Sequence, residues 1–252
     1  MESNCQSLNL FIYPSKKVII MRKILTSIML IMLIIGATFS VQAKSSLQHK
    51  HTADCEKTLA EPVQIICILD RSGSMHPLAN DVIGGYNSFL DKQKKESGKA
   101  EVTTVLFDDQ YEKIVNAADI QTAENLTSAI YYARGNTALM DAVGRTITET
   151  LAQMEKEKIC PAKRRVLIMI MTDGLENASK EYNKSSVKTL IDATTKDYGW
   201  NYLFIGANID SAAEANSIGI DSSRASNISA DSEGIQESFE RMNTAAKEVR
   251  EK

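Results

Sequence analysis

Two segments of the chain are almost entirely apolar over the length of a single β-strand. Residues 63–69 read Val-Gln-Ile-Ile-Cys-Ile-Leu, and residues 165–172 read Arg-Val-Leu-Ile-Met-Ile-Met-Thr. Short apolar runs without alternation are typical of strands that are buried on both faces, as in parallel sheets. These two segments therefore predict a sheet that is covered by helices on both sides.

Helical patterns stand between and after the predicted strands. One helix is predicted over residues 79–96 and a longer one from Thr137, because apolar residues recur there at steps of three and four positions. A third such pattern occupies the end of the chain. The apolar stripes comprise Val82, Ile83, Tyr86, Phe89 and Leu90; Met140, Val143, Ile147, Leu151 and Met154; and Ile235, Phe239, Met242, Ala246 and Val249. We interpret each stripe as the side of a helix that faces the core.

The remaining segments complete an alternation of strands and helices. The polar pair Asp108-Asp109 is short enough to predict an antiparallel hairpin between its flanking strands. Residues 116–134 are predicted to be irregular, with one short helix at most. Further strands are predicted at residues 101–107, 110–115, 202–206 and 225–228, and further helices at residues 209–217 and between a cap at Ser185 or Ser186 and a stop at Gly199. The alternation predicts βαβ units in a doubly wound, mostly parallel α/β sheet.

The N-terminal region has the layout of a secretory signal. Met21-Arg22-Lys23 precedes an apolar run over residues 24–37, and small residues end in Val41-Gln42-Ala43, as in a signal peptide with its cleavage site. We interpret residues 1–43 as a signal peptide region with Met21 as a candidate start, residues 44–61 as a linker, and the protein as secreted or periplasmic. Two alternatives remain open. They are a buried helix and an uncleaved membrane anchor, which needs ~17–25 residues, with the domain outside the cytoplasm.

The composition is that of a folded globular protein, with 43% hydrophobic and 24% charged residues and a net charge of −3. Nucleic acid is disfavoured as a partner because phosphate binding needs a basic face, and only two short basic runs occur, at residues 92–95 and 163–165. No Cys-x-x-Cys pair indicates a zinc site. Cys67 is predicted to lie in the core, and pairing of Cys55 with Cys160 remains open.

Three short polar motifs lie where predicted strands end or where the long helix begins. They are Asp70-Arg71-Ser72-Gly73-Ser74, Gly135-Asn136-Thr137 and Thr172-Asp173-Gly174. In doubly wound sheets, ligands bind outside the carboxyl ends of the strands. We therefore expect one edge of the sheet to bring together Asp70, Ser72, Ser74, Thr137 and Asp173.

These residue types favour a hard divalent cation. Hydroxyl and carboxylate oxygens suit Mg²⁺, Mn²⁺ or Ca²⁺ and are poor ligands for zinc or copper. Gly73 permits the bend that turns alternate positions toward one point. If the hydroxyls bind directly and the carboxylates bind through water, the metal keeps a positive field and an open position. An external carboxylate is the best occupant of that position, so the motifs predict a site that binds a protein ligand presenting Asp or Glu.

In this order and at these positions, the three motifs resemble those of the von Willebrand factor A (VWA) domain and its metal-ion-dependent adhesion site (MIDAS), most closely in single-domain bacterial members. The resemblance extends over residues 62–248, and we assign the domain to residues 62–252. It implies a Rossmann-like, six-stranded sheet with one antiparallel edge strand, and a non-catalytic adhesion or recruitment module. It also implies direct coordination by Ser72, Ser74 and Thr137, with Asp70 and Asp173 acting through water. Asn136 stands where many relatives have glycine.

Other classes of protein fit the motifs less well. A haloacid-dehalogenase-type phosphatase needs a second carboxylate two positions after Asp70, where this chain has Ser72. A serine hydrolase is disfavoured because Gly-x-Ser-x-Gly is absent and His76 has no placed partner. A metal-free relic, a metal-dependent hydrolase and a membrane-anchored recruitment subunit for a separate enzyme remain open. For Asp141 and Glu176, a surface charge is expected at least as much as a metal ligand.

Overall fold

A single mixed sheet forms the centre of the domain. The computed structural model describes residues 60–251, and its six strands follow the order β3-β2-β1-β4-β5-β6. All neighbouring strands pair in parallel except β2 and β3, which form the predicted antiparallel hairpin at the edge. The strands are β1 (Ala60–Asp70), β2 (Ala100–Phe107), β3 (Tyr111–Asp119), β4 (Arg164–Thr172), β5 (Asn201–Ala207) and β6 (Ala225–Ile228). The predicted fold class is confirmed.

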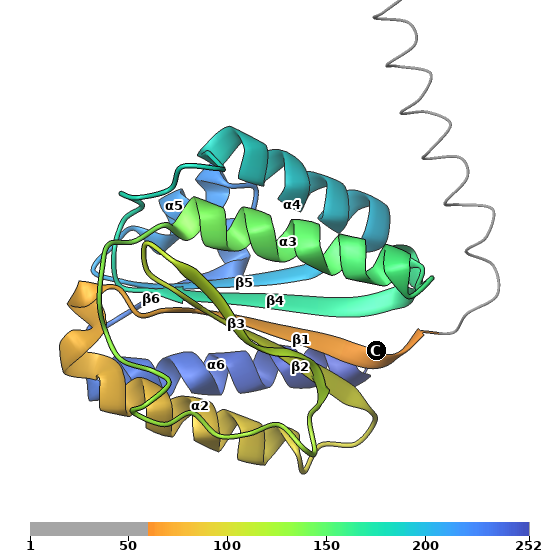
Figure 1. The fold of residues 1–252 in the computed structure, drawn as a ribbon, viewed down its shortest axis with the longest axis horizontal. Coiled ribbons are helices and arrows are strands. Elements are labelled where there is room, and N and C mark those ends of the chain that lie inside the picture. Colours follow the sequence, from red (N-terminus) through yellow and green to blue (C-terminus); the bar gives the residue numbers. More distant parts are fainter. Residues whose placement is uncertain (1–59, 252) are drawn as a thin grey trace, which may run out of the picture. The chain divides into compact units, whose positions relative to one another are not determined.

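Helices cover both faces of the sheet (Figure 1). One face carries α2 (Ala79–Gln93) and α6 (Ser232–Glu251), and the other carries α3 (Leu139–Lys156), α4 (Lys184–Tyr198) and α5 (Ser211–Ser217). The predicted stripes are the packed sides, because Phe89 and Met242 are buried in one core while Val143 and Ile147 are buried in the other. The 3₁₀ turns are η2 (Gly73–Leu78), η3 (Pro161–Lys163) and η4 (Ser222–Arg224).

Three local predictions were wrong. The long helix begins at Leu139 and not at Thr137, because the Thr137 amide donates to Asn177 Oδ1 outside any helix. The cap of α4 is Asn183, and Ser186 is its reciprocal partner three positions on, in a capping box. The strand predicted over residues 110–115 continues to Asp119 as β3, so the predicted irregular segment is confirmed only from residue 120 to residue 134.

The order of the strands reverses beside β1. From β1 the chain builds outward through β2 and β3 on one side, and through β4, β5 and β6 on the other. Strand order therefore reverses between β1 and β4, which is where ligands bind in open α/β sheets. The register pairs Leu69 with Met171, so the residues that leave these two strands, Asp70 and Thr172, lie level with each other.

The predictions for the N-terminal region concern residues outside the described part of the chain. They are the signal region, the linker as far as residue 59, and Cys55 of the candidate disulfide. Within residues 60–251, no helix has the length and hydropathy that a membrane span requires. Cys67 is a buried free thiol, as predicted.

Candidate metal centre

Asp70 is the most firmly held residue of the candidate centre. Its side chain is fully buried at the end of β1. Its Oδ1 accepts the Ser72 amide at 2.6 Å, and its Oδ2 accepts the Thr172 hydroxyl at 2.5 Å. The Tyr131 hydroxyl donates to the Asp70 carbonyl oxygen at 2.5 Å. The strand ends and the loop before α3 thus hold this carboxylate in one orientation.

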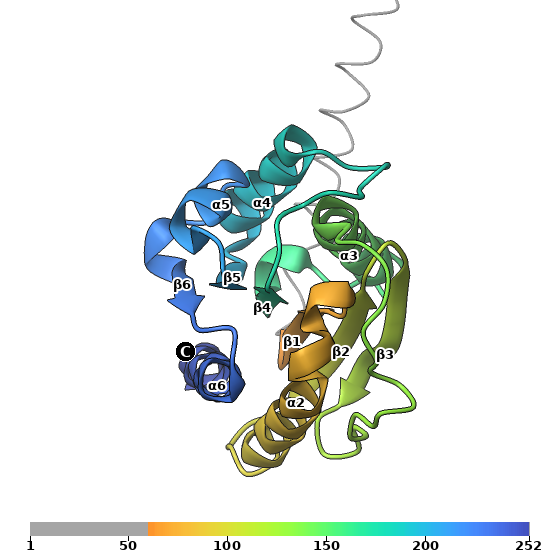
Figure 2. The same ribbon diagram turned by 90° about the vertical axis from the view of Figure 1, so that its left-hand side faces the viewer.

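The hydroxyl groups form a chain that leads to the second carboxylate. Ser72 Oγ lies 3.2 Å from Ser74 Oγ, and Ser74 Oγ donates to Asp173 Oδ1 at 2.6 Å. A Cβ atom at Gly174 would lie 3.4 Å from Thr137 Oγ1 and 3.9 Å from Ser74 Oγ, so these two hydroxyls flank the same glycine. The structure therefore brings all five predicted residues together at the carboxyl edge of the sheet, which faces the viewer in Figure 2.

Gly135 lets the loop before α3 lie close to its neighbouring loops. The Gly73 amide donates to the Gly135 carbonyl at 3.1 Å, which joins the loop after β1 to the loop before α3. Gly135 has φ +65°, and a Cβ atom there would lie 2.3 Å from Asp109 Oδ1. At Gly73 a Cβ atom would meet its nearest neighbour at 3.4 Å, an ordinary contact. Glycine is therefore required at position 135 more than at position 73.

The two carboxylates lack a cation of the protein. Burial raises the pKa of Asp70 to about 6, against hydrogen bonds from Thr172 and Ser72, and the negative charge of Asp173 raises it further. Burial also raises the pKa of Asp173. Within residues 60–251, no Lys, Arg or His forms an ion pair with either group. This uncompensated charge beside three hydroxyls fits a hard divalent cation.

A second group of charged residues lies beside the centre, and each of its carboxylates is paired with guanidinium groups. Arg71 turns away from Asp70, placing Nε 3.2 Å from Asp108 Oδ2 and Nη2 2.6 Å from Glu112 Oε1. Arg134 lies 2.6 Å from each of the same two carboxylates. Both guanidinium groups lie over the ring of Tyr132, at 5.6 and 5.4 Å from its centroid. We call these five residues the arginine cluster. Sequence reasoning missed it, although Arg71 stands between two predicted ligands.

Asp141 and Glu176 position the loop that follows β4. The Asp141 carboxylate accepts backbone amides from residues 180, 181 and 182 at 2.7–2.9 Å. Glu176 accepts the Met140 amide at the start of α3 at 2.8 Å, as well as the Ser179 amide and hydroxyl. Both are more than surface charges, because they fasten this loop to α3. No sequence pattern marks such contacts.

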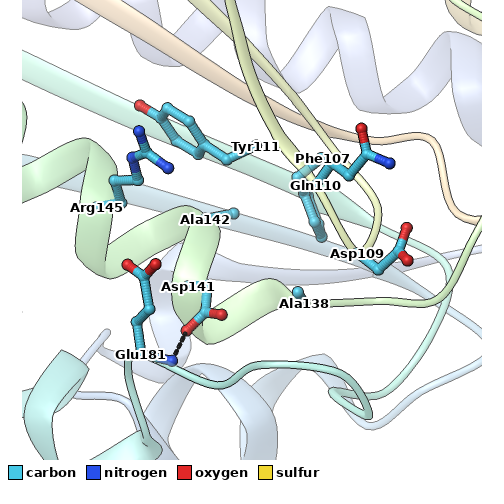
Figure 3. Close-up of a pocket in the computed structure, with 9 residues that line it drawn as sticks. All are labelled: Phe107, Asp109, Gln110, Tyr111, Ala138, Asp141, Ala142, Arg145 and Glu181. Atoms are coloured by element: carbon cyan, nitrogen blue, oxygen red, sulfur yellow. Dashed lines mark hydrogen bonds between the residues drawn. The ribbon is translucent and has the colours of Figure 1, made fainter.

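A small pocket adjoins the centre, between the β2–β3 turn, the start of α3 and the loop before α4 (Figure 3). Its volume is about 170 Å³. Arg145 lies 4.6 Å over the Tyr111 ring, and Asp141 accepts the Glu181 amide. The lining of the pocket includes the exposed carboxylates of Asp109 and Glu181 and none of the five candidate residues. Within residues 60–251, no group of three or more His, Cys, Asp or Glu is placed to hold a metal, so the centre depends on its hydroxyls.

The chain is similar to known proteins in sequence pattern and in fold. It matches the family model of the von Willebrand factor type A domain over residues 64–241. Among curated proteins, no sequence matches it. One similar structure is proximal thread matrix protein 1 from the mussel byssus with a zinc-occupied MIDAS motif. It has 15% identity and a TM-score of 0.51, and the match covers 75% of this chain and 46% of that one.

Two bacterial pilus proteins also share the fold. The adhesin SpaC from Lactobacillus rhamnosus GG has 13% identity and a TM-score of 0.55, and the match covers 76% of this chain and 30% of that one. The vWF domain of the type V pili tip protein Mfa5 from Porphyromonas gingivalis has 11% identity and a TM-score of 0.51, with 77% and 98% covered. This chain spans less than half of the byssus protein and of SpaC.

At such low identities the similar structures establish the fold alone. The family model extends over more than half of the sequence and agrees with the topology of the sheet. The chain belongs to the von Willebrand factor type A domain family.

Proposed function

We propose that Asp70, Ser72, Ser74, Thr137 and Asp173 bind one divalent cation, and that the domain uses it to capture an acidic side chain of a partner protein. The observation that carries this proposal is the meeting of three neutral hydroxyls with two carboxylates that form no ion pair with a cationic side chain of residues 60–251. In the proposed arrangement, Ser72, Ser74 and Thr137 coordinate directly, and the two carboxylates act through water. The cation then keeps enough positive charge to attract a further carboxylate.

The exposure of the five residues supports binding from outside. Asp70, Ser72, Thr137 and Asp173 are buried, whereas Ser74 is exposed. Solvent and a partner therefore reach the centre from the Ser74 side. The known fold relatives include a pilus adhesin, and an adhesive or recruiting role for this chain agrees with that likeness.

A non-catalytic role fits the chemistry of the site better than hydrolysis. Hydrolysis at a serine or at a metal-bound water needs a positioned general base. The described residues contain one histidine, His76, and its side chain is exposed in η2. Asp70 and Asp173 already accept hydrogen bonds from hydroxyl groups of the same site.

The location and the ion remain part of the proposal. We place the domain outside the cytoplasm on the strength of the signal-like segment over residues 21–43, either free or held by an uncleaved anchor. N-terminal sequencing of the exported protein separates these two states, because a start near Lys44 excludes the anchor.

Mg²⁺, Mn²⁺ and Ca²⁺ all suit the oxygen donors, and the zinc-occupied motif of the byssus protein makes Zn²⁺ worth including in a comparison of ions.

A capture experiment tests the proposed function. The immobilised protein is exposed to extracellular proteins of its source in Mg²⁺, in EDTA, and in EDTA followed by excess Mg²⁺. We expect a partner that binds wild type in Mg²⁺, leaves in EDTA, returns with Mg²⁺ and fails to bind Asp70→Ala. The exposed variant Glu181→Gln is the matched control and should bind as wild type does. Capture that is unaffected by both EDTA and Asp70→Ala would contradict the proposal.

A further inference from the structure

The large apolar side chains that are exposed belong to two segments next to the candidate centre, the loop before α3 and the loop after β4. Within the described residues they are Ile130 at 37%, Tyr132 at 45% and Leu175 at 59% exposure. Ile130 and Tyr132 flank Tyr131, whose hydroxyl is bonded to Asp70, and Leu175 follows Asp173 by two positions. Scattered exposed apolar residues are normal on a protein surface, but a group confined to one functional edge indicates an interaction site. We call these three residues the apolar rim.

Leu175 is exposed on a loop whose backbone is hydrogen-bonded both before and after it. The Gly174 amide donates to Thr172 Oγ1 at 3.3 Å, and the Asn177 amide donates to the Thr137 carbonyl at 3.0 Å. Glu176 accepts the Met140 amide at the start of α3. These bonds fix the backbone around Leu175 and leave its side chain in solvent. Its exposure is therefore a feature of the fold and not of a loose segment.

Tyr132 is also held in place while it faces solvent. Arg71 and Arg134 lie over its ring, and Arg134 Nη1 donates to its hydroxyl at 3.0 Å. The neighbouring Ile130 amide donates to the Thr127 carbonyl at 2.9 Å, in a turn. Ordering these side chains in advance reduces the entropy that a partner would lose in fixing them.

We infer that the partner presents its acidic residue between apolar side chains, which pack on Leu175, Ile130 and Tyr132. This inference rests on the proposed function. A carboxylate bound to a metal in open water competes with water for that position, and a surrounding apolar contact excludes the water. The cation supplies the charge complement for the partner carboxylate, and the apolar rim selects the residues beside it.

Selection from short random peptides displayed on phage tests the inference. The immobilised full chain is loaded with Mg²⁺, and bound peptides are released with EDTA. Released peptides should contain Asp or Glu flanked by apolar residues. They should bind Ile130→Ser/Leu175→Ser about tenfold more weakly than wild type, although that variant binds Mn²⁺ as wild type does. Ala193→Ser, which changes an exposed position on α4, is the control and should bind the peptides normally.

The possible failures are distinguishable. If the released peptides are acidic without an apolar preference, or bind the Ile130→Ser/Leu175→Ser variant as tightly as wild type, the inference is wrong and the proposed function stands. If selection yields no peptide that EDTA releases, the proposed function is contradicted and the inference falls with it.

Discussion

Two groups of carboxylates lie side by side at the carboxyl edge of the sheet, and they differ in how their charge is balanced. In the arginine cluster, Asp108 and Glu112 each lie 3.2 Å or less from two guanidinium groups. In the candidate metal centre, Asp70 and Asp173 accept hydrogen bonds from hydroxyls and an amide but pair with no cation of the described residues.

One carboxylate of each group illustrates the contrast, because the pKa values of Glu112 and Asp70 are shifted in opposite directions. A hydrogen bond from Arg71 lowers the pKa of Glu112, whereas burial raises the pKa of Asp70. Where the protein supplies the counter-charge, a carboxylate stabilises the fold. Where no described residue supplies it, as at Asp70 and Asp173, the proposed cation would provide the counter-charge, and the metal-free protein would be less stable for its absence.

The largest effect is expected in the arginine cluster. Asp108→Asn removes the fully buried one of the two carboxylates that pair with the Arg71 guanidinium, which should lower the free energy of unfolding by about 3–5 kcal/mol. Urea denaturation in EDTA measures this value. The neighbouring exposed carboxylate is the control, and Asp109→Asn should stay within about 0.5 kcal/mol of wild type. Equal stability of the two variants would remove the structural half of the comparison.

The Asp70 carboxylate of the candidate metal centre should destabilise the metal-free protein, whereas the Asp108 carboxylate stabilises it. The pKa of Asp70 is about 6 in the metal-free fold, against an ordinary value of 3.8. Because the folded value is the higher one, protonation favours the fold, and this stabilisation is lost as the pH rises through about 6. Asp70 should therefore weaken the metal-free protein above that pH by up to about 2–3 kcal/mol.

Asp70→Asn isolates this effect. The stability difference between Asp70→Asn and wild type in EDTA should grow in favour of the variant as the pH rises from about 4 to about 7. Added Mg²⁺ should stabilise wild type and leave the variant unchanged. A loss in Asp70→Asn as large as that in Asp108→Asn would show that the Asp70 carboxylate is a structural group and would contradict the contrast.

The smallest effect is expected where the loop before α3 touches the centre. Tyr131→Phe removes the hydrogen bond to the Asp70 carbonyl and should cost about 1 kcal/mol of unfolding free energy. Tyr132→Phe removes an exposed hydrogen bond from Arg134 and should cost less than about 0.5 kcal/mol. Denaturation of both variants gives the comparison. If Tyr132→Phe costs more than Tyr131→Phe, the assigned role of the buried hydroxyl is wrong.

The strands and the five candidate residues were predictable from the sequence because both depend on local pattern. Apolar runs place β1 and β4, and polar motifs directly follow the strand ends at Asp70 and Asp173. The start of α3 was not predictable. It depends on hydrogen bonds from the Thr137 and Ala138 amides to Asn177 and Asp108, which are distant in sequence.

The contacts that position the residues around the centre were not predictable from the sequence for the same reason. Arg71 binds across the sheet to residues of the β2–β3 hairpin, and Asp141 accepts amides from a loop about forty positions away. Backbone amides are present at almost every position, so a carboxylate that accepts them leaves no sequence signal. Structure was needed to separate these positioning carboxylates from the two that are available to a cation.

The proposed site holds one divalent cation per chain, between Asp70, Ser72, Ser74, Thr137 and Asp173. Titration of EDTA-stripped protein with Mn²⁺, with free Mn²⁺ followed by electron paramagnetic resonance, tests it directly. We expect a single Mn²⁺ per chain, an affinity about 10–100-fold lower in Asp173→Ala, and an unchanged affinity in Glu181→Gln. Absence of binding to wild type, or equal binding by Asp173→Ala, would contradict the account.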